Sequence, residues 1–180
     1  VLKQSFGLHN FSFQGLKMEN ELYKIYSNLK SNQSIGIDGI SKQKLDEIID
    51  DEIAIIKRKI ENNSYEFSFY KQKLLVKSIN KTREISIPTL RDKIVLRYLF
   101  NEISNSFKDT LTTKLHANMI ISEVIENREN FNAFIKVDIV NFFPSINHEI
   151  LLDKLKTKIF DENILNLITK AIKQTTVDEK

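Results

Sequence analysis

A single aspartate at the end of an apolar run is the residue in this sequence best placed to do chemistry. Asp138 lies in residues 133–139, where side chains alternate in character with the period of two expected of a strand. The alternation places Ile135, Val137 and Ile139 on one face and Asp138 on the other. A carboxylate held rigidly at a strand end can serve as a metal ligand, although these residues alone also fit a turn or capping aspartate.

The residues that follow Asp138 read Ile-Val-Asn-Phe-Phe-Pro-Ser-Ile, so that paired aromatics and a Ser-Ile follow the aspartate. This block resembles the first catalytic palm motif of reverse transcriptases of the bacterial group II intron, retron and phage-defence type. Four upstream blocks, in the family's order, resemble its G-x-D-G block, its Y-x-F strand, its G-K-x-R hairpin and its I-P-x-x-x-D-(R/K) helix start. These blocks are Gly36-Ile37-Asp38-Gly39, Tyr65-Glu66-Phe67, Lys81-Thr82-Arg83 and Ile87-Pro88-Thr89-Leu90-Arg91-Asp92-Lys93.

The resemblance implies an RNA-directed DNA polymerase that joins deoxynucleoside triphosphates to a primer 3′-hydroxyl on an RNA template. Such enzymes use two Mg²⁺ ions, one at the attacking oxygen and one at the leaving group. By resemblance, Asp138 binds metal, and Ile139 lends its backbone carbonyl to the metal and the nucleotide. Lys77 and Arg83 would grip the triphosphate, as an ammonium and a planar guanidinium can. Phe143 would close the space beside the sugar 2′ carbon and exclude ribonucleotides by a clash.

The family completes its site with a later Y-x-D-D-type hairpin, and nothing after Asp138 resembles it. One motif carboxylate cannot assemble a two-metal site, so we expect that the isolated chain does not synthesise DNA. The remaining palm and thumb would lie in the same polypeptide or in a partner, and we interpret the chain as a truncated portion of the enzyme. Three alternatives stay open: a non-catalytic RNA-binding module, a phage-defence polymerase that works without a template, and an interaction domain with coincidental motifs.

The composition of the chain limits the kinds of binding site and partner that it can have. The 180 residues carry a net charge of +3, which is compatible with a nucleic-acid partner. The absence of cysteine excludes disulfides and cysteine-based zinc sites, and the three histidines are too scattered to form a zinc pair. No glycine-rich phosphate loop is present. Apolar runs are too short to span a membrane, so we expect a cytoplasmic protein with no membrane partner.

Hydrophobic periodicity predicts an α+β fold. Helices are expected over residues 19–30, 41–61, 90–107, around 120–125, 148–157 and 162–174. Thr89 is expected to cap the helix that begins at residue 90, and Asp161 to start the last helix. Strands are expected over residues 65–70, 82–87 and 133–139, with the first two joined by a turn within 78–81. A loop of odd length centred on Asn80 would set Lys77 opposite Arg83, and Gly36 and Gly39 suit positive φ.

In terms of the resemblance, this pattern predicts helix-rich polymerase fingers with a β-hairpin, followed by the first palm strand and further helices. The expected organisation is an N-terminal helical extension over residues 1–33, a fingers-like region over 34–130 and a partial palm over 131–180. Within the block that follows Asp138, Phe142 is expected in the core and Phe143 beside the sugar of the nucleotide.

Overall fold

The computed structural model describes the chain except residues 1, 32, 79–80, 111–116, 136, 138 and 179–180. Helices and strands both occur in the described residues, which confirms the predicted α+β class. None of the described helices combines the length and the apolar character needed to cross a membrane. The elements are α1 (Leu2–Ser27), α2 (Lys42–Glu47), α3 (Ile49–Glu61), β1 (Tyr70–Ser78), β2 (Lys81–Ile87), α4 (Leu90–Ser106), α5 (Ala117–Glu126), the 3₁₀ helix η1 (Phe143–Ser145), α6 (His148–Lys156), α7 (Glu162–Ile172) and β3 (Thr176–Val177).

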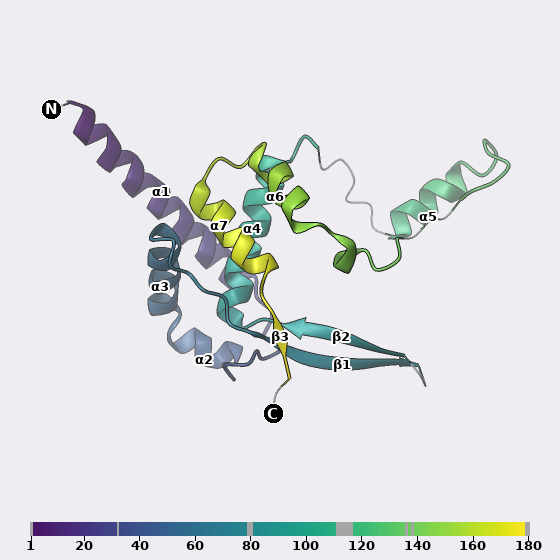
Figure 1. Ribbon diagram of the computed structural model, residues 1–180, viewed down its shortest axis with the longest axis horizontal. Helices are drawn as coiled ribbons and strands as arrows, with labels where there is room; N and C mark the ends of the chain where they lie inside the picture. Colours follow the sequence, from purple (N-terminus) through teal and green to yellow (C-terminus); the bar gives the residue numbers. More distant parts are fainter. Residues whose placement is uncertain are drawn as a thin grey trace.

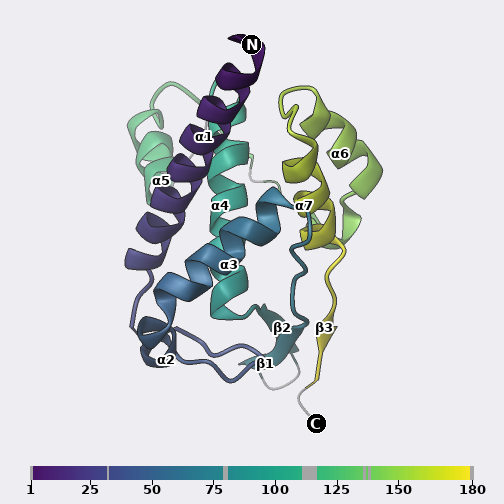
Figure 2. The same ribbon diagram turned by 90° about the vertical axis from the view of Figure 1, so that its left-hand side faces the viewer.

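Four helices, α1, α3, α4 and α7, pack together around the main apolar core (Figures 1 and 2). Each presents apolar residues at intervals of three and four, so that one stripe of each helix is buried. Burying each such side chain contributes about 1.5–3 kcal/mol. The most deeply buried members are Leu22, Ile53, Ile56, Leu90, Ile94 and Val95.

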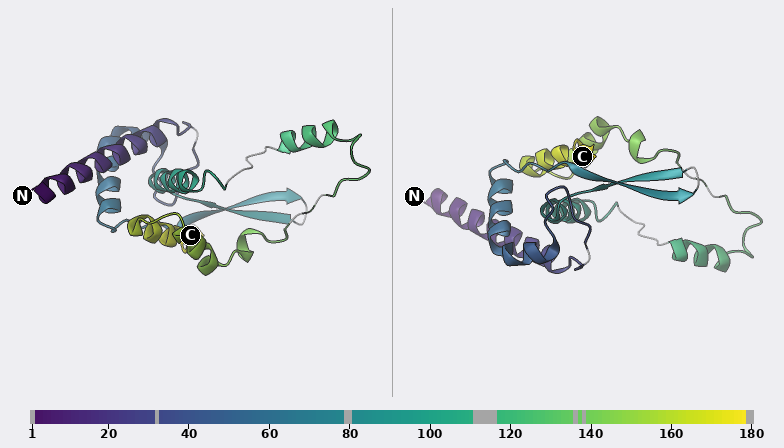
Figure 3. Two further views of the ribbon diagram at one scale, coloured as in Figure 1. Left: turned by 90° about the horizontal axis from the view of Figure 1, so that it is seen from above. Right: turned by 90° about the horizontal axis from the view of Figure 1, so that it is seen from below.

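The sheet has the strand order β2-β1-β3. β1 and β2 form an antiparallel hairpin that projects away from the bundle of α1, α3, α4 and α7 (Figure 3). β3 joins the base of the hairpin in parallel, with Thr176 opposite Tyr70 and Val177 opposite Lys71. The sequence did not predict β3, because two residues are too few to show a periodic pattern.

Helix α5 stands apart from the helical bundle (Figure 1). The predicted helix around residues 120–125 is confirmed, yet Ile120, Ile121 and Ile125 are 48%, 56% and 56% exposed. The described residues between α5 and η1 are nearly all exposed as well. The prediction that residues 133–139 form a strand is wrong for the described residues of that range, none of which is in a strand. A strand requires a ladder partner, and the described sheet does not extend to this segment.

Two other predicted elements differ from the structure. The helix predicted over residues 41–61 is divided at Ile48, whose φ of −126° ends α2 before α3 begins. The bend allows both pieces to follow α1, because the Tyr26 hydroxyl donates to Asp46 of α2 while Tyr23 donates to Asp50 of α3 at 2.8 Å. The strand predicted over residues 65–70 begins only at Tyr70.

The segment before β1 is extended but makes its polar contacts outside a ladder. Asp92, at the start of α4, is 1% exposed. Its carboxylate accepts from the Tyr65 hydroxyl at 2.7 Å, the Ser68 backbone N–H at 3.1 Å and the Thr89 hydroxyl at 2.8 Å. Thr89 in turn caps α4 by accepting from the Asp92 N–H at 3.1 Å, as the sequence predicted. Asp92 therefore joins the chain entering the hairpin to the helix leaving it.

The two glycines of the first motif block are required for different reasons. Gly39 has a φ of +68°, which confirms the prediction of positive φ at this position. Gly36 does not share that conformation. Instead, a Cβ at Gly36 would lie 2.6 Å from the Thr89 Cα, so this loop can pack on the α4 cap only without a side chain.

We predict that Asp92→Ala lowers the free energy of unfolding by roughly 3–5 kcal/mol, because two buried hydroxyls and one partly buried N–H lose their acceptor. Urea denaturation followed by circular dichroism measures the change. Asp153→Ala is the matched control, since the Asp153 side chain is 77% exposed and pairs with Lys156 at 3.4 Å. A loss at Asp92 no larger than the loss at Asp153 would show that the cluster does not hold the fold together.

Candidate functional site

The β-hairpin carries two of the residues predicted to contact the nucleotide. Its register pairs Arg83 with Leu75, and Ser78 with Lys81. The connection is therefore two residues long, which is an even number, and Lys77 is an extra residue on β1 between two paired positions. The prediction that Lys77 lies opposite Arg83 is wrong for this reason. Arg83 is exposed on β2, and the Lys77 side chain lies outside the described part of the structure.

The base of the hairpin is fixed by the C-terminal helix. The Lys170 ammonium donates to the Tyr65 carbonyl at 2.9 Å and to the Glu66 carboxylate at 2.6 Å. The Gln174 amide donates to the Phe67 carbonyl at 2.6 Å. These contacts satisfy carbonyls that a ladder would otherwise use, which explains why residues 65–69 are extended without pairing. Sequence reasoning missed Lys170 and Gln174, because no local pattern marks contacts across 104 and 107 residues.

Side-chain hydroxyls tie β3 to the other strand of the hairpin. The Ser86 and Thr176 hydroxyl oxygens are 2.6 Å apart, and the Tyr70 N–H donates to the Thr175 carbonyl at 3.0 Å. The hairpin is thus anchored at its base by α4 and by the α7–β3 segment, while Arg83 lies further along the strand toward the tip.

The block after Asp138 forms a tight turn. Asn141 has a φ of +52°, a conformation that asparagine tolerates better than most residues. The Ser145 N–H donates to the Asn141 carbonyl at 3.0 Å, and the Ser145 hydroxyl donates to the Phe142 carbonyl at 2.8 Å. Asn147 then caps α6 by accepting from Glu149 and Ile150. The turn therefore has its own hydrogen bonds and leads directly into α6.

The two phenylalanines of this turn meet edge to face, with ring centroids 5.2 Å apart. Phe143 is 76% exposed and Phe142 is 49% exposed. The prediction that Phe142 lies in the core is therefore wrong, because nothing described packs over the turn tightly enough to bury it. Ile139 is 63% exposed, and Asp138 itself lies outside the described residues.

The predicted site residues that the structure describes come from two separate parts of the chain. Arg83 belongs to the hairpin, whereas Ile139 and Phe143 belong to the segment before α6. Within the described ranges, no group of three or more histidine or acidic side chains is arranged to hold a metal ion. The roles of Asp138, Lys77 and the other predicted site residues stay predictions.

Apolar side chains are concentrated on the segment from α5 to η1. Their exposure is unusual, because monomeric proteins seldom leave a large contiguous apolar surface open to water. The most exposed described members are Phe131, Ile135, Val137, Ile139, Val140 and Phe143. Within the described residues, this segment therefore carries a large share of the exposed apolar side chains.

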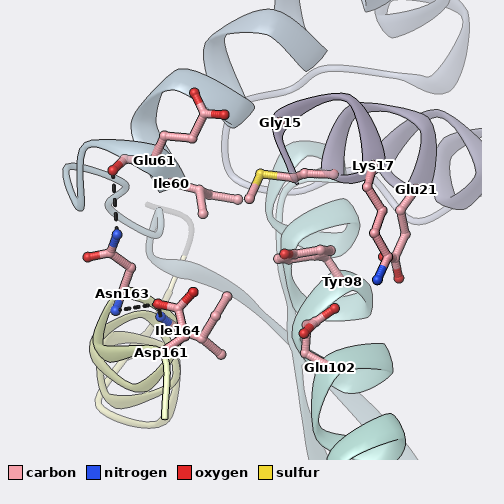
Figure 4. Close-up of a pocket in the computed structure, with 11 residues that line it drawn as sticks. Gly15, Lys17, Glu21, Ile60, Glu61, Tyr98, Glu102, Asp161, Asn163 and Ile164 are labelled. Atoms are coloured by element: carbon pink, nitrogen blue, oxygen red, sulfur yellow. Dashed lines mark hydrogen bonds between the residues drawn. The ribbon is translucent and has the colours of Figure 1, made fainter. Parts of the chain in front are cut away.

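A cavity of about 260 Å³ lies between α1, α3, α4 and the start of α7 (Figure 4). Figure 4 shows Tyr98 and Glu102 of α4 facing Asp161 and Ile164 across it. The Asp161 carboxylate is already engaged in capping α7, because it accepts from the Asn163 N–H at 2.9 Å. Burial, aided by the charge of Glu21, raises the pKa of Glu102 above its usual value, and Lys17 opposes this effect.

Comparisons with known proteins relate the chain to intron-encoded proteins. No protein-family model matches it. It is 25% identical over 179 residues to a 91 kDa protein in the cob intron of Schizosaccharomyces pombe, a match covering 89% of this chain and 22% of that protein. It is also 25% identical over 172 residues to a COX1/OXI3 intron 1 protein of Saccharomyces cerevisiae, covering 92% of this chain and 21% of that protein.

A bacterial protein is similar over the same extent. Protein YkfC of Escherichia coli is 23% identical over 170 residues, which cover 88% of this chain and 45% of YkfC. The chain therefore spans less than half the length of each of these relatives.

The raised pKa of Glu102 predicts a pH-dependent effect on stability. Because the folded state holds this proton more tightly than the unfolded state, stability declines as pH rises from the ordinary carboxyl pKa through the raised value. Glu102→Gln removes that decline. We expect the variant to raise the melting temperature relative to the unmodified chain more at pH 7 than at pH 4.

Thermal unfolding monitored by circular dichroism at both pH values measures this difference. Glu129→Gln serves as the control, because the Glu129 side chain is 85% exposed. We expect its effect to be small and nearly equal at the two pH values. A Glu102→Gln effect that is also equal at both would contradict the explanation.

Proposed function

We propose that this chain forms the fingers and the first part of the palm of a reverse transcriptase. The observation that carries the proposal is the sequence order of four upstream motif blocks followed by the Asp138 block. The similarity to proteins named for the cob and COX1/OXI3 introns supports a reverse-transcriptase or maturase-like role. Exposed Arg83 on a projecting hairpin is compatible with a nucleotide contact.

In the proposed enzyme, each predicted residue has a separate task. Asp138 would supply a carboxylate to Mg²⁺, and Ile139 would offer its backbone carbonyl as a further oxygen ligand. Arg83 and Lys77 neutralise the triphosphate, to which arginine offers two parallel donors and lysine a single point charge. Phe143 limits the space at the sugar 2′ position. RNA template, primer and deoxynucleoside triphosphates are the proposed partners.

The donor set of this chain does not by itself fit two magnesium ions, which require several carboxylate oxygens. Asp138 is the one carboxylate of the catalytic palm block in the sequence, and the described residues contain no group of three or more histidine or acidic side chains that could hold a metal. We therefore assign no reaction step to the metal within this chain. Further carboxylates would be supplied by the rest of the palm, in the same polypeptide or in a partner.

The same dependence on one carboxylate favours a second candidate, a reverse-transcriptase-like module that binds RNA without catalysis. A phage-defence polymerase that extends DNA without a template shares the Asp138 block and is a third possibility. Reactions with and without template RNA distinguish the phage-defence polymerase from the reverse transcriptase. The RNA-binding module differs from both polymerases because it incorporates no nucleotide in either reaction.

We predict that Asp138→Asn, made in the polypeptide encoded by the native gene, abolishes primer extension on an RNA template. The amide keeps the size of the side chain but removes the negative charge that binds metal. Incorporation of labelled deoxynucleotides measures activity, and RNA affinity is measured in parallel. We expect RNA affinity to remain unchanged, and we expect the 180-residue chain alone to incorporate nothing.

Asp153→Asn is the matched control, because the Asp153 side chain is exposed on α6. It should retain full activity. Primer extension that survives Asp138→Asn would remove the catalytic role, and an inactive native polypeptide that still binds RNA would favour the binding module.

We further predict that Phe143→Ala increases the use of ribonucleotides relative to deoxynucleotides on the order of tenfold or more. The smaller side chain removes the clash with the 2′-hydroxyl. The ratio of kcat/KM for the two nucleotide types measures selectivity. Phe142→Ala is the neighbouring control, and an equal change in both variants would assign Phe143 to packing.

A further inference from the structure

A groove with more basic side chains than the cavity of Figure 4 lies between α1 and α4. It shares Lys17 and Glu21 with the cavity of Figure 4 but is otherwise lined by other faces of the two helices. The helices pack side by side, as Figure 2 shows, and the Asn101 amide of α4 donates to Glu21 of α1 at 2.9 Å. None of the proposed catalytic or nucleotide-binding residues contributes to this groove.

Basic side chains dominate the groove. Lys17 and Lys24 extend from α1, and Lys93 and Arg97 extend from α4. The single lining carboxylate, Glu21, already accepts from an asparagine amide. Four positive charges beside one engaged carboxylate create a local positive potential that attracts a polyanion.

The spacing of these residues forms a continuous track. On α4, Lys93, Arg97, Asn101 and Asn105 recur every fourth residue and therefore share one face of the helix. At 1.5 Å per residue this face is about 18 Å long. The asparagines of the two helices line the groove between and beyond the cations, and they offer neutral donors and acceptors.

Two of the cations are held in place by neighbouring groups. The Arg97 guanidinium lies 4.8 Å from the centre of the Phe100 ring, a cation–π contact that restrains the side chain. The Lys93 ammonium donates to the Ser34 carbonyl at 2.8 Å. Lys24 and Arg97 are both exposed, so a ligand can reach them without rearrangement of the helices.

We propose that the α1–α4 groove binds the phosphate backbone of single-stranded RNA and anchors it away from the hairpin. The choice of RNA rests on the proposed function, whereas the choice of a polyanion rests on the groove itself. Lysine and arginine contact phosphates, and asparagine amides can contact phosphates or 2′-hydroxyls. The groove lining contains no aromatic side chain on which bases could stack, so binding is largely independent of sequence.

The test compares two charge-reversed forms of the full 180-residue chain. One carries Lys24→Glu and Arg97→Glu in the groove. The other carries Lys44→Glu and Arg58→Glu, which make the same change in net charge at exposed positions of α2 and α3. Fluorescence anisotropy with a mixed-sequence single-stranded RNA oligonucleotide, measured over a range of KCl concentrations, gives the affinity and its salt dependence.

We expect the groove variant to bind RNA on the order of tenfold more weakly, with the slope of log affinity against log salt reduced by about 1–2. The control variant should remain within about twofold. A single-stranded DNA oligonucleotide should show the same pattern, because the phosphates are shared. Equal losses in both variants, or a groove variant that keeps its RNA affinity, would overturn the proposal.

Two further measurements separate a loss of RNA binding from a loss of folding and from repulsion by the new acidic side chains. Circular dichroism melting checks that each variant is folded, and a neutral form with Lys24→Gln and Arg97→Gln tests the groove again without introducing acidic charges. An acidic peptide that loses binding to the groove variant while RNA affinity is unchanged would assign the groove to a protein partner. Failure of catalysis in Asp138→Asn leaves this test unaffected, because RNA binding to the 180-residue chain is measured without nucleotide.

Discussion

The buried carboxylate of Asp92 is the interaction on which the rest of the fold depends. Burying a carboxyl group is costly unless its oxygens are hydrogen-bonded, and here Tyr65, Ser68 and Thr89 provide the donors. These donors lie on the chain before the hairpin and on the cap of α4. One side chain therefore fixes the direction of the hairpin, the start of the central helix and the position of the loop at Gly36, which packs on the same cap.

The α7–β3 segment provides the second support and connects the two parts of the proposed site. Lys170 and Gln174 hold the strand entering the hairpin, while α6, which directly follows the turn with Phe143, packs against α7. The hairpin that carries Arg83 and the turn that carries Phe143 are thus attached to a common helix. This shared attachment is the structural basis on which the proposed polymerase would align them.

The sequence predicted those features that depend on local chemistry. Thr89 and Asp161 cap α4 and α7 as expected, and Gly39 adopts positive φ. The predictions that the structure contradicts depend instead on contacts between distant parts of the chain. Residues 65–69 are extended without a ladder because side chains about 105 residues away bind carbonyls of this segment. The described residues of 133–139 have no partner strand in the described sheet, and alternation alone cannot supply one. For the candidate site, the motif order supplied the predicted residues. It could not supply the register of the hairpin, because Lys77 is an extra residue on β1 that sequence spacing does not reveal.

The pairing of β3 with β1 has a consequence for the order of events during synthesis. The hairpin strands are neighbours in sequence and can form soon after they leave the ribosome, whereas Gln174 contacts Phe67 across 107 residues. We expect this contact to form late in folding. Bringing residues 67 and 174 together reduces the conformational entropy of the intervening chain, and the contacts that offset this loss form only when residue 174 is present. The growing chain therefore carries a hairpin with an unlocked base until residues 170–177 emerge, and for that interval the strand that enters the hairpin lacks the contacts that hold it in the folded molecule.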